Sequence, residues 1–177
     1  PPEPPPPDPP PPAPLTSSNV SHLLVSEVQA GTEAGGAEDE FVELYNPTDA
    51  PIALDGFSLK KQSSTGSESN LVSSGAFTGT IPAHGFFLVG HESYSGLVPR
   101  DLVYSANSNN LAYTDNAVAL YDASGVLVDL VSWGEIPKGT AIERMAWSAG
   151  TCVSASESGA GLGNGCDTDS AADFEAR

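Results

Sequence analysis

Basic residues are scarce in this chain, which has 6 Lys and Arg against 23 Asp and Glu among 177 residues, a formal net charge of −17. Nucleic-acid backbones and anionic membrane surfaces bind clustered Lys and Arg, whereas here only Lys60 and Lys61 are adjacent. Long apolar runs are also missing, since no segment approaches the ~20 apolar residues of a membrane-spanning helix. We therefore expect neither a nucleic-acid partner nor direct membrane insertion.

Cysteine is rare as well, with only Cys152 and Cys166 in the chain. Two cysteines cannot make a four-thiolate zinc site, and their spacing is far from C-x-x-C. We expect a local disulfide between them, which is typical of an oxidising compartment; two free thiols are the alternative. Together with the acidity, the cysteine pair indicates an extracellular or cell-surface protein.

Catalytic motifs are absent from the sequence. It contains neither a G-x-S-x-G elbow nor a G-x-x-x-x-G-K-[ST] phosphate loop. His91 and Glu92 resemble the start of a zinc-protease helix, but the second His of that motif is missing, and His22 and His84 fall on other predicted elements. We expect no catalytic residue and no bound cofactor, apart from the weak calcium site described below, and predict that the chain is not an enzyme.

Proline dominates residues 1–14, where it occupies eleven of fourteen positions. Proline fixes φ and lacks an N–H donor, so this segment is predicted to be a semi-rigid polyproline II arm about 43 Å long. The arm is either a spacer or a docking arm that binds an aromatic surface. Its candidate interacting residues are Pro4, Pro5, Pro6, Pro7, Pro9, Pro10, Pro11 and Pro12.

Residues 15–136 consist of short apolar segments separated by turn signals, without helical periodicity. We expect strands at 23–28, 41–45, 52–54, 57–59, 86–89, 117–121 and 126–133, and a polar loop over 62–70. This pattern predicts an antiparallel β-sandwich. Its candidate core residues are Leu24, Val28, Val42, Leu44, Leu54, Phe57, Leu59, Phe86, Leu88, Val118, Leu120, Val128, Leu130 and Trp133.

Residues 137–177 are rich in Gly, Ser and Ala. We expect a loop-rich C-terminal extension that packs on the sandwich and is held by the cysteine pair. Asp167, Asp169 and Asp173 begin with the D-x-D spacing of calcium loops but lack the central Gly and the terminal Glu of those loops. Weak calcium binding is predicted at these aspartates or around Glu38 and Asp39, with solvated acidic loops as the alternative.

Five segments resemble the lamin-tail domain, an immunoglobulin-like sandwich of nuclear lamins and many bacterial secreted proteins. They are the Ser-Glu-Val strand at 24–28, the acidic-aromatic-Val-Glu-Leu-aromatic-Asn segment at 40–48, the Leu-x-Gly-aromatic-x-Leu corner at 54–59, the Pro-x-x-Gly turn at 81–85 and the hairpin at 120–133. The resemblance covers roughly residues 22–135. It implies an immunoglobulin-like fold for the predicted sandwich.

The resemblance also implies a non-catalytic module of the bacterial, exported branch of the family, because the chain has neither a lamin coiled coil nor a prenylation box. Three residues of the motifs are interpreted as structural. Glu27 and Glu43 lie in strands built for burial and need partners, which turn backbone donors or Lys60 could supply. Asn46 is suited to capping a turn with its side chain.

Two functions are compatible with the sequence. The first is a structural or interaction module that assembles with copies of itself, or with another cell-surface protein, through the proline arm, giving a filament or other homopolymer. Its candidate acceptors, expected in exposed loops, are Tyr94, Tyr104, Tyr113 and Trp147. The alternative is a spacer-linked accessory or adhesion module of a larger secreted hydrolase.

Overall fold

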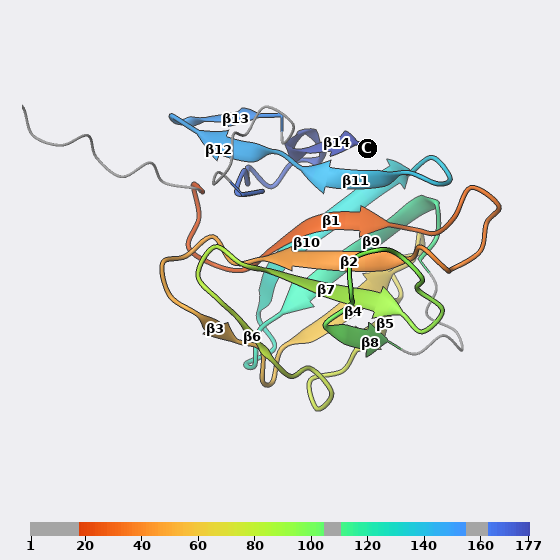
Figure 1. The fold of residues 1–177 in the computed structure, drawn as a ribbon, viewed down its shortest axis with the longest axis horizontal. Coiled ribbons are helices and arrows are strands. Elements are labelled where there is room, and N and C mark those ends of the chain that lie inside the picture. The colour runs from red at the N-terminus through yellow and green to blue at the C-terminus, as the bar shows by residue number, and fades with distance from the viewer. Residues whose placement is uncertain (1–17, 105–110, 155–162) are drawn as a thin grey trace, which may run out of the picture.

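The computed structural model describes residues 18–104, 111–154 and 163–177. Two sheets face each other in the described part of the chain (Figure 1). The larger has the order β14 (Phe174–Ala176), β11 (Ala141–Arg144), β1 (Leu24–Gln29), β2 (Phe41–Tyr45), β7 (Phe86–His91) and β8 (Leu102–Tyr104). The smaller has the order β10 (Leu127–Glu135), β9 (Thr114–Tyr121), β4 (Ser58–Gln62) and β5 (Glu68–Val72). The predicted all-β sandwich is confirmed.

Two short ribbons and one 3₁₀ turn complete the described structure. The ribbons are β3 (Ile52–Ala53) with β6 (Thr80–Ile81), and β12 (Ala146–Ser148) with β13 (Thr151–Val153); the turn is η1 (Ala171–Asp173). All strand pairs are antiparallel except β7 with β8, which is parallel. None of the helical segments that the structure describes is long and apolar enough to cross a membrane.

One apolar core fills the space between the two sheets. Alternate residues of a strand point to the same face, so Val28, Val42 and Leu44 of the larger sheet meet Leu59 and Leu120 of the smaller one. These five side chains are fully buried. The alternation read from the sequence therefore placed most of the core correctly.

Two predicted core residues are exposed, and both are corrections. Phe86 lies on the outer face of β7, 43% exposed, because its neighbour Phe87 takes the inward position. Leu130 is 45% exposed. A bulge between Leu127 and Asp129 shifts the register of β10, so that Asp129 and Val131 are buried instead.

The polar loop expected over residues 62–70 is partly wrong. Strand β5 begins at Glu68 and pairs with β4 in a hairpin closed by the turn at 63–67. Strand β5 forms because its last two residues, Leu71 and Val72, are buried in the core. The corner at 54–59 forms as expected: Phe57 N donates to Leu54 O, and Gly56 has a φ of 86°, which glycine adopts without strain.

The C-terminal segment contains four strands rather than mainly loops. Strand β11 pairs with β1, and β14 pairs with β11, so both belong to the six-stranded sheet. Strands β12 and β13 form a separate hairpin. Residues after 136 therefore contribute one edge of the larger sheet.

Candidate functional site

The side chain of Asn46 holds the turn that follows β2, as the sequence predicts. Its Nδ2 donates to the carbonyls of Ala50 (2.8 Å), Ile81 (3.1 Å) and Pro82 (3.0 Å). Its Oδ1 accepts from Thr48 N at 3.0 Å. One buried amide thus joins two turns that are distant in the sequence.

The predicted disulfide between Cys152 and Cys166 is confirmed. It joins β13 to the segment before η1, and Cys166 is fully buried. The backbone N–H of Cys166 also donates to Met145 O at 3.1 Å. The disulfide therefore fixes the end of the chain against the residues that follow β11.

Arg144, at the end of β11, is a fully buried cation that links three parts of the fold. Its Nε donates to Val25 O in β1 at 2.9 Å, and its Nη2 lies 2.7 Å from Asp129 Oδ2 in β10. Its Nη1 donates to Cys166 O at 2.9 Å and to Asp167 Oδ1 at 3.0 Å. The guanidinium thus connects both sheets to the disulfide segment.

The carboxylates around Arg144 have shifted pKa values with opposite signs. Burial raises the pKa of Asp129, against the lowering effects of Arg144 and of the Val25 N–H, which donates at 2.7 Å. A hydrogen bond from His22 and the charge of Arg144 lower the pKa of Asp167 to about 2, although burial opposes them. Asp167 is therefore ionised opposite Arg144 at neutral pH.

The first described residues attach to the same cluster. Asp167 N donates to Asn19 Oδ1 at 2.9 Å, and Asn19 Nδ2 donates back to Asp167 O. Ser18 Oγ donates to Gly165 O at 2.6 Å. We call these contacts of Ser18 and Asn19 the arm root, because only three residues separate the proline-rich residues 1–14 from Ser18 in the sequence. The oxygen and the nitrogen of the Asn19 side-chain amide both bond to the backbone of Asp167, so the arm root is attached to the C-terminal segment.

Two of the three aspartates predicted to bind calcium face protein donors. Asp173 accepts from Thr168 N at 2.7 Å, Thr168 Oγ1 at 2.7 Å and Ser170 N at 3.2 Å, and so caps η1. Asp167 faces Arg144, while Asp169 is exposed. Calcium binding stays a prediction, and an ion at Asp167 or Asp173 would compete with these donors.

One group of three His, Cys or acidic residues within the described ranges has metal-binding geometry. It consists of Cys152, Cys166 and Asp173. Because its two sulfur atoms form the disulfide, neither is a thiolate, the form in which cysteine binds metals. The group is therefore part of the disulfide environment.

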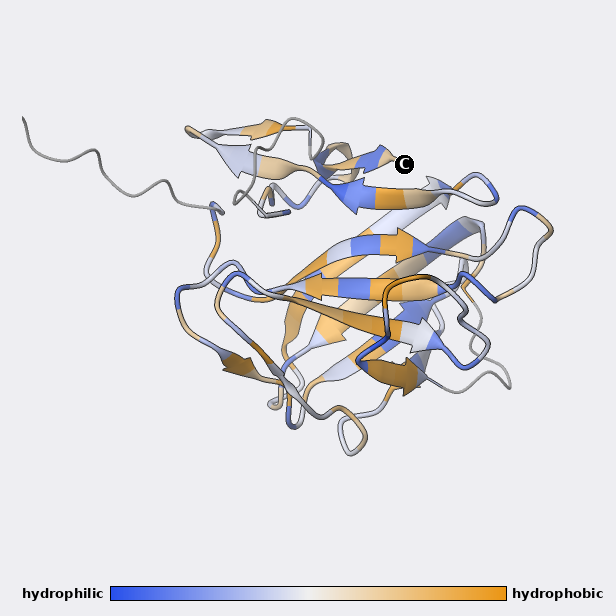
Figure 2. Ribbon diagram, in the orientation of Figure 1, coloured by the Kyte–Doolittle hydropathy of each residue, from blue (hydrophilic) through white to orange (hydrophobic). Residues whose placement is uncertain are grey.

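Four glutamates lie in register across the outer face of the larger sheet. Glu175 pairs with Glu143, Glu143 with Glu27, and Glu27 with Glu43. We call them the glutamate row; Figure 2 shows hydrophilic positions at the centres of β1 and β2, side by side between apolar ones. Like charges at directly opposite positions destabilise a sheet.

The donors for this row are not the ones expected. Glu43 accepts from Ser26 Oγ at 2.8 Å, and Glu143 accepts from Arg177 Nε at 2.6 Å. Lys60 was suggested as a partner, but it lies on the other sheet and pairs with Glu68 at 3.0 Å. Burial, followed by the charges of Glu43 and Glu143, raises the pKa of Glu27 to about 7.

Tyr104 is not an exposed loop residue, so its expected role as an acceptor for the arm is wrong in this fold. It belongs to β8 and is fully buried in the apolar core, where its hydroxyl donates to Glu40 Oε1, also buried, at 2.6 Å. Burial raises the pKa of Glu40 to about 7. His91 packs edge-on against the Tyr104 ring, with the ring centroids 5.7 Å apart.

The other three aromatic candidates are partly accessible. Tyr94 packs edge-on against Phe41 at 6.0 Å, Tyr113 donates to a backbone carbonyl at 2.9 Å, and Trp147 lies opposite Cys152 in the β12–β13 hairpin. The prolines at 4–12 lie outside the described residues. The contact between arm and aromatics stays a prediction.

Sequence reasoning missed the Arg144 cluster. A signal for half of it was present: Asp129 is a lone charge within the apolar run 126–133, and a buried charge requires a partner. Arg144 carried no comparable signal, because its partners lie on β1, β10 and the disulfide segment.

The sequence profile of the lamin tail domain matches residues 16–135. No curated protein matches the chain. The match covers β1 to β10, so the edge made by β11 and β14 lies beyond it. The sandwich of two sheets with one core agrees with the immunoglobulin-like architecture of that family. The chain belongs to the lamin tail domain family, whose immunoglobulin-like domain is structural and not typically enzymatic.

Proposed function

We propose that this protein is a structural module of an extracellular or cell-surface protein, of the bacterial exported branch of its family, that assembles with other copies of itself through the proline arm. The observation that carries the proposal is the arm root. Two hydrogen bonds join the Asn19 amide to the backbone of Asp167, and a third joins Ser18 to Gly165.

A fixed root favours docking over a purely passive spacer. Asp167 is itself held by Arg144 and His22, so the described residues nearest to the arm are fixed to the fold. A polyproline II segment loses little conformational entropy on binding. Holding the arm root in place should reduce the entropic cost of binding the arm further, because preorganisation lowers the cost of association.

Charge limits the kind of contact that can hold the copies together. Each chain has a formal charge of −17, so subunits repel one another at low salt. Residues 1–14 contain only two charged side chains, Glu3 and Asp8. The contact therefore depends on apolar burial and backbone hydrogen bonds, and a head-to-tail arrangement of this kind extends into a filament.

The exported location is supported by the disulfide. Disulfides persist in oxidising compartments and are rare in the cytosol of most organisms. The disulfide joins β13 to the segment that holds the arm root. Loss of the disulfide would therefore loosen the contacts that Gly165 and Asp167 make with the arm root.

Deletion of residues 1–14 tests the proposal, with the mass of the full chain and the deletion variant measured by light scattering and their shape by negative-stain microscopy. We expect the full chain to form oligomers or filaments and the deletion variant to be a monomer. Asn19→Ala should weaken assembly to an intermediate level because it loosens the root. If the full chain is monomeric at high concentration, or if the deletion leaves assembly unchanged, the arm is a spacer, as in an accessory module of a larger secreted hydrolase.

A further inference from the structure

Three large apolar side chains near one edge of the larger sheet are exposed. Leu97 is fully exposed, Val98 is 60% exposed and Val103 is 49% exposed. They come from the loop between β7 and β8 and from β8 itself. We call these three residues the β8 patch. Exposed apolar groups in one region of a protein are typical of interaction sites.

The loop that carries Leu97 and Val98 is firmly held. Arg100 Nη1 donates to the carbonyls of His91 at 2.7 Å, Glu92 at 3.0 Å and Tyr94 at 3.2 Å. Ser95 N donates to Glu38 O at 2.7 Å. The fold therefore keeps Leu97 in solvent although the residues on both sides of it are anchored.

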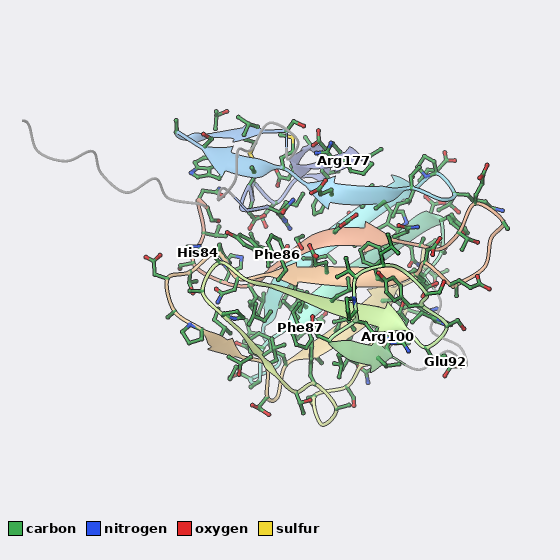
Figure 3. All side chains as sticks on the ribbon, viewed as in Figure 1. His84, Phe86, Phe87, Glu92, Arg100 and Arg177 are labelled. Atoms are coloured by element: carbon green, nitrogen blue, oxygen red, sulfur yellow. A yellow bond between two sulfur atoms is a disulfide. The ribbon has the colours of Figure 1, made fainter. Side chains whose placement is uncertain are left out.

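Strand β8 is an edge strand, and the arm root lies by the other edge of the same sheet. The sheet order runs from β14 and β11 at one edge to β8 at the other, and the root binds Asp167 and Gly165 next to Arg144 of β11. In Figure 1 the first described residues lie near β12, and β8 lies on the opposite side. Figure 3 labels Arg177 beside β14 and Arg100 beside β8, at the two edges of the larger sheet.

These positions suit a head-to-tail contact between copies. Six strands give five spacings of ~4.8 Å, so the sheet is about 24 Å wide. The arm is expected to reach about 43 Å, which exceeds that width. An arm that leaves one edge of a subunit is therefore long enough to reach the opposite edge of a subunit placed beside it.

We propose that the β8 patch is the acceptor to which the proline arm of a neighbouring copy binds. This inference rests on the proposed function and adds the site on the partner. Proline rings are apolar and cover Leu97, Val98 and Val103. Proline carbonyls accept hydrogen bonds but proline offers no N–H, so the arm suits a sheet edge that presents backbone N–H groups.

The charges around the patch favour this occupant over an acidic one. Glu92 and Asp101 are exposed on the same loop. Their negative charges repel an acidic surface of a neighbouring copy. They repel the proline arm less, because the arm has only two charged residues in fourteen. Half-exposed Tyr94, one of the aromatic candidates, belongs to the same loop and extends the surface.

The test uses the full chain carrying Leu97→Ser, Val98→Ser and Val103→Ser together. Assembly is measured by light scattering, and folding is checked by circular dichroism and thermal melting. A synthetic peptide of residues 1–17 serves as the probe for binding to the chain that lacks residues 1–14. The control is Leu130→Ser, which removes a side chain about as exposed as Val103 (45% against 49%) from β10 of the other sheet.

We expect the triple variant to fold and to lose assembly, and its affinity for the peptide to fall by about tenfold or more, since three apolar contacts are lost. Leu130→Ser should change neither. If the triple variant assembles and binds the peptide normally while the arm deletion abolishes assembly, the acceptor is wrong and the proposed function stands. If Leu130→Ser alone abolishes assembly, the acceptor is on β10. If the arm deletion has no effect on assembly, the proposed function fails.

Discussion

Replacing Glu27 with Gln should stabilise the protein at pH 8 and leave it nearly unchanged at pH 4. Burial and the neighbouring Glu43 and Glu143 raise the pKa of Glu27 from 4.5 to about 7. One pKa unit corresponds to ~1.4 kcal/mol, so the full effect is about 3–4 kcal/mol. Because Glu27 is only partly buried, solvent screening reduces this to about 2 kcal/mol.

The sign follows from which state holds the proton. Below pH 4.5 the Glu27 carboxyl is protonated in both states and has no effect on stability. Between pH 4.5 and 7 the unfolded chain releases the proton while the folded protein keeps it, so the free energy of unfolding falls as pH rises. Above pH 7 the penalty is complete. A glutamine side chain resembles the protonated carboxyl and avoids the penalty.

Urea unfolding of wild type and Glu27→Gln at pH 4, 6 and 8 measures the effect. Glu135→Gln is the matched control, because Glu135 is exposed in β10. The variant keeps part of the pH dependence, since burial also raises the pKa of Glu40 to about 7. The reasoning is refuted if Glu27→Gln is no more stable than wild type at pH 8, or if its gain is the same at pH 4 and pH 8.

Four further predictions concern the other polar clusters. Arg144→Met should lower the free energy of unfolding by about 3–5 kcal/mol at pH 7 in urea titrations, because it leaves buried aspartates without a cation; a loss below about 1 kcal/mol would contradict this. Asn46→Ala should cost about 2–3 kcal/mol, since it leaves buried carbonyls without a donor, and an unchanged melting temperature would argue against that role. Reduction of Cys152–Cys166 should cost about 3 kcal/mol and remove hydrogen-exchange protection from β12 and β13 but not from β1; uniform loss across both sheets would be the opposite result. Calcium should bind at Asp167, Asp169 or Asp173, or around Glu38 and Asp39, with an affinity of about 10⁻⁴–10⁻³ M, and the absence of both heat and thermal shift at about 10 mM calcium would reject it.

The strands of the core were predictable because their alternation is local. In the segments at 41–45 and 117–121 the sequence and the structure agree on which residues face the core, namely Val42, Leu44, Val118 and Leu120. The bulge before Asp129 was not predictable, since it depends on how β10 pairs with β9. An unbroken apolar run such as 86–89 also gives no sign of which residues point inward.

The site was harder to predict because its contacts are distant in the sequence. Arg144 meets Val25 across 119 residues, and Asn19 meets Asp167 across 148. The turn at Asn46 was predictable, since capping by Asn involves backbone groups only two to four residues away. The interactions that the sequence did not predict are therefore those between residues that only the folded topology brings together.

The pairing of β1 with β11 also sets the order in which the protein can fold. Gln29 lies opposite Ala141, so β1 leaves the ribosome long before the strand that closes its edge. Contacts of such long sequence separation are slow to form, with all-β domains folding in milliseconds to seconds. Until β11 arrives, β1 exposes an open edge to other nascent chains. Strand β11 thus acts as a late closing step, and a chain truncated after residue 136 should aggregate even though it contains the whole region that the family profile matches.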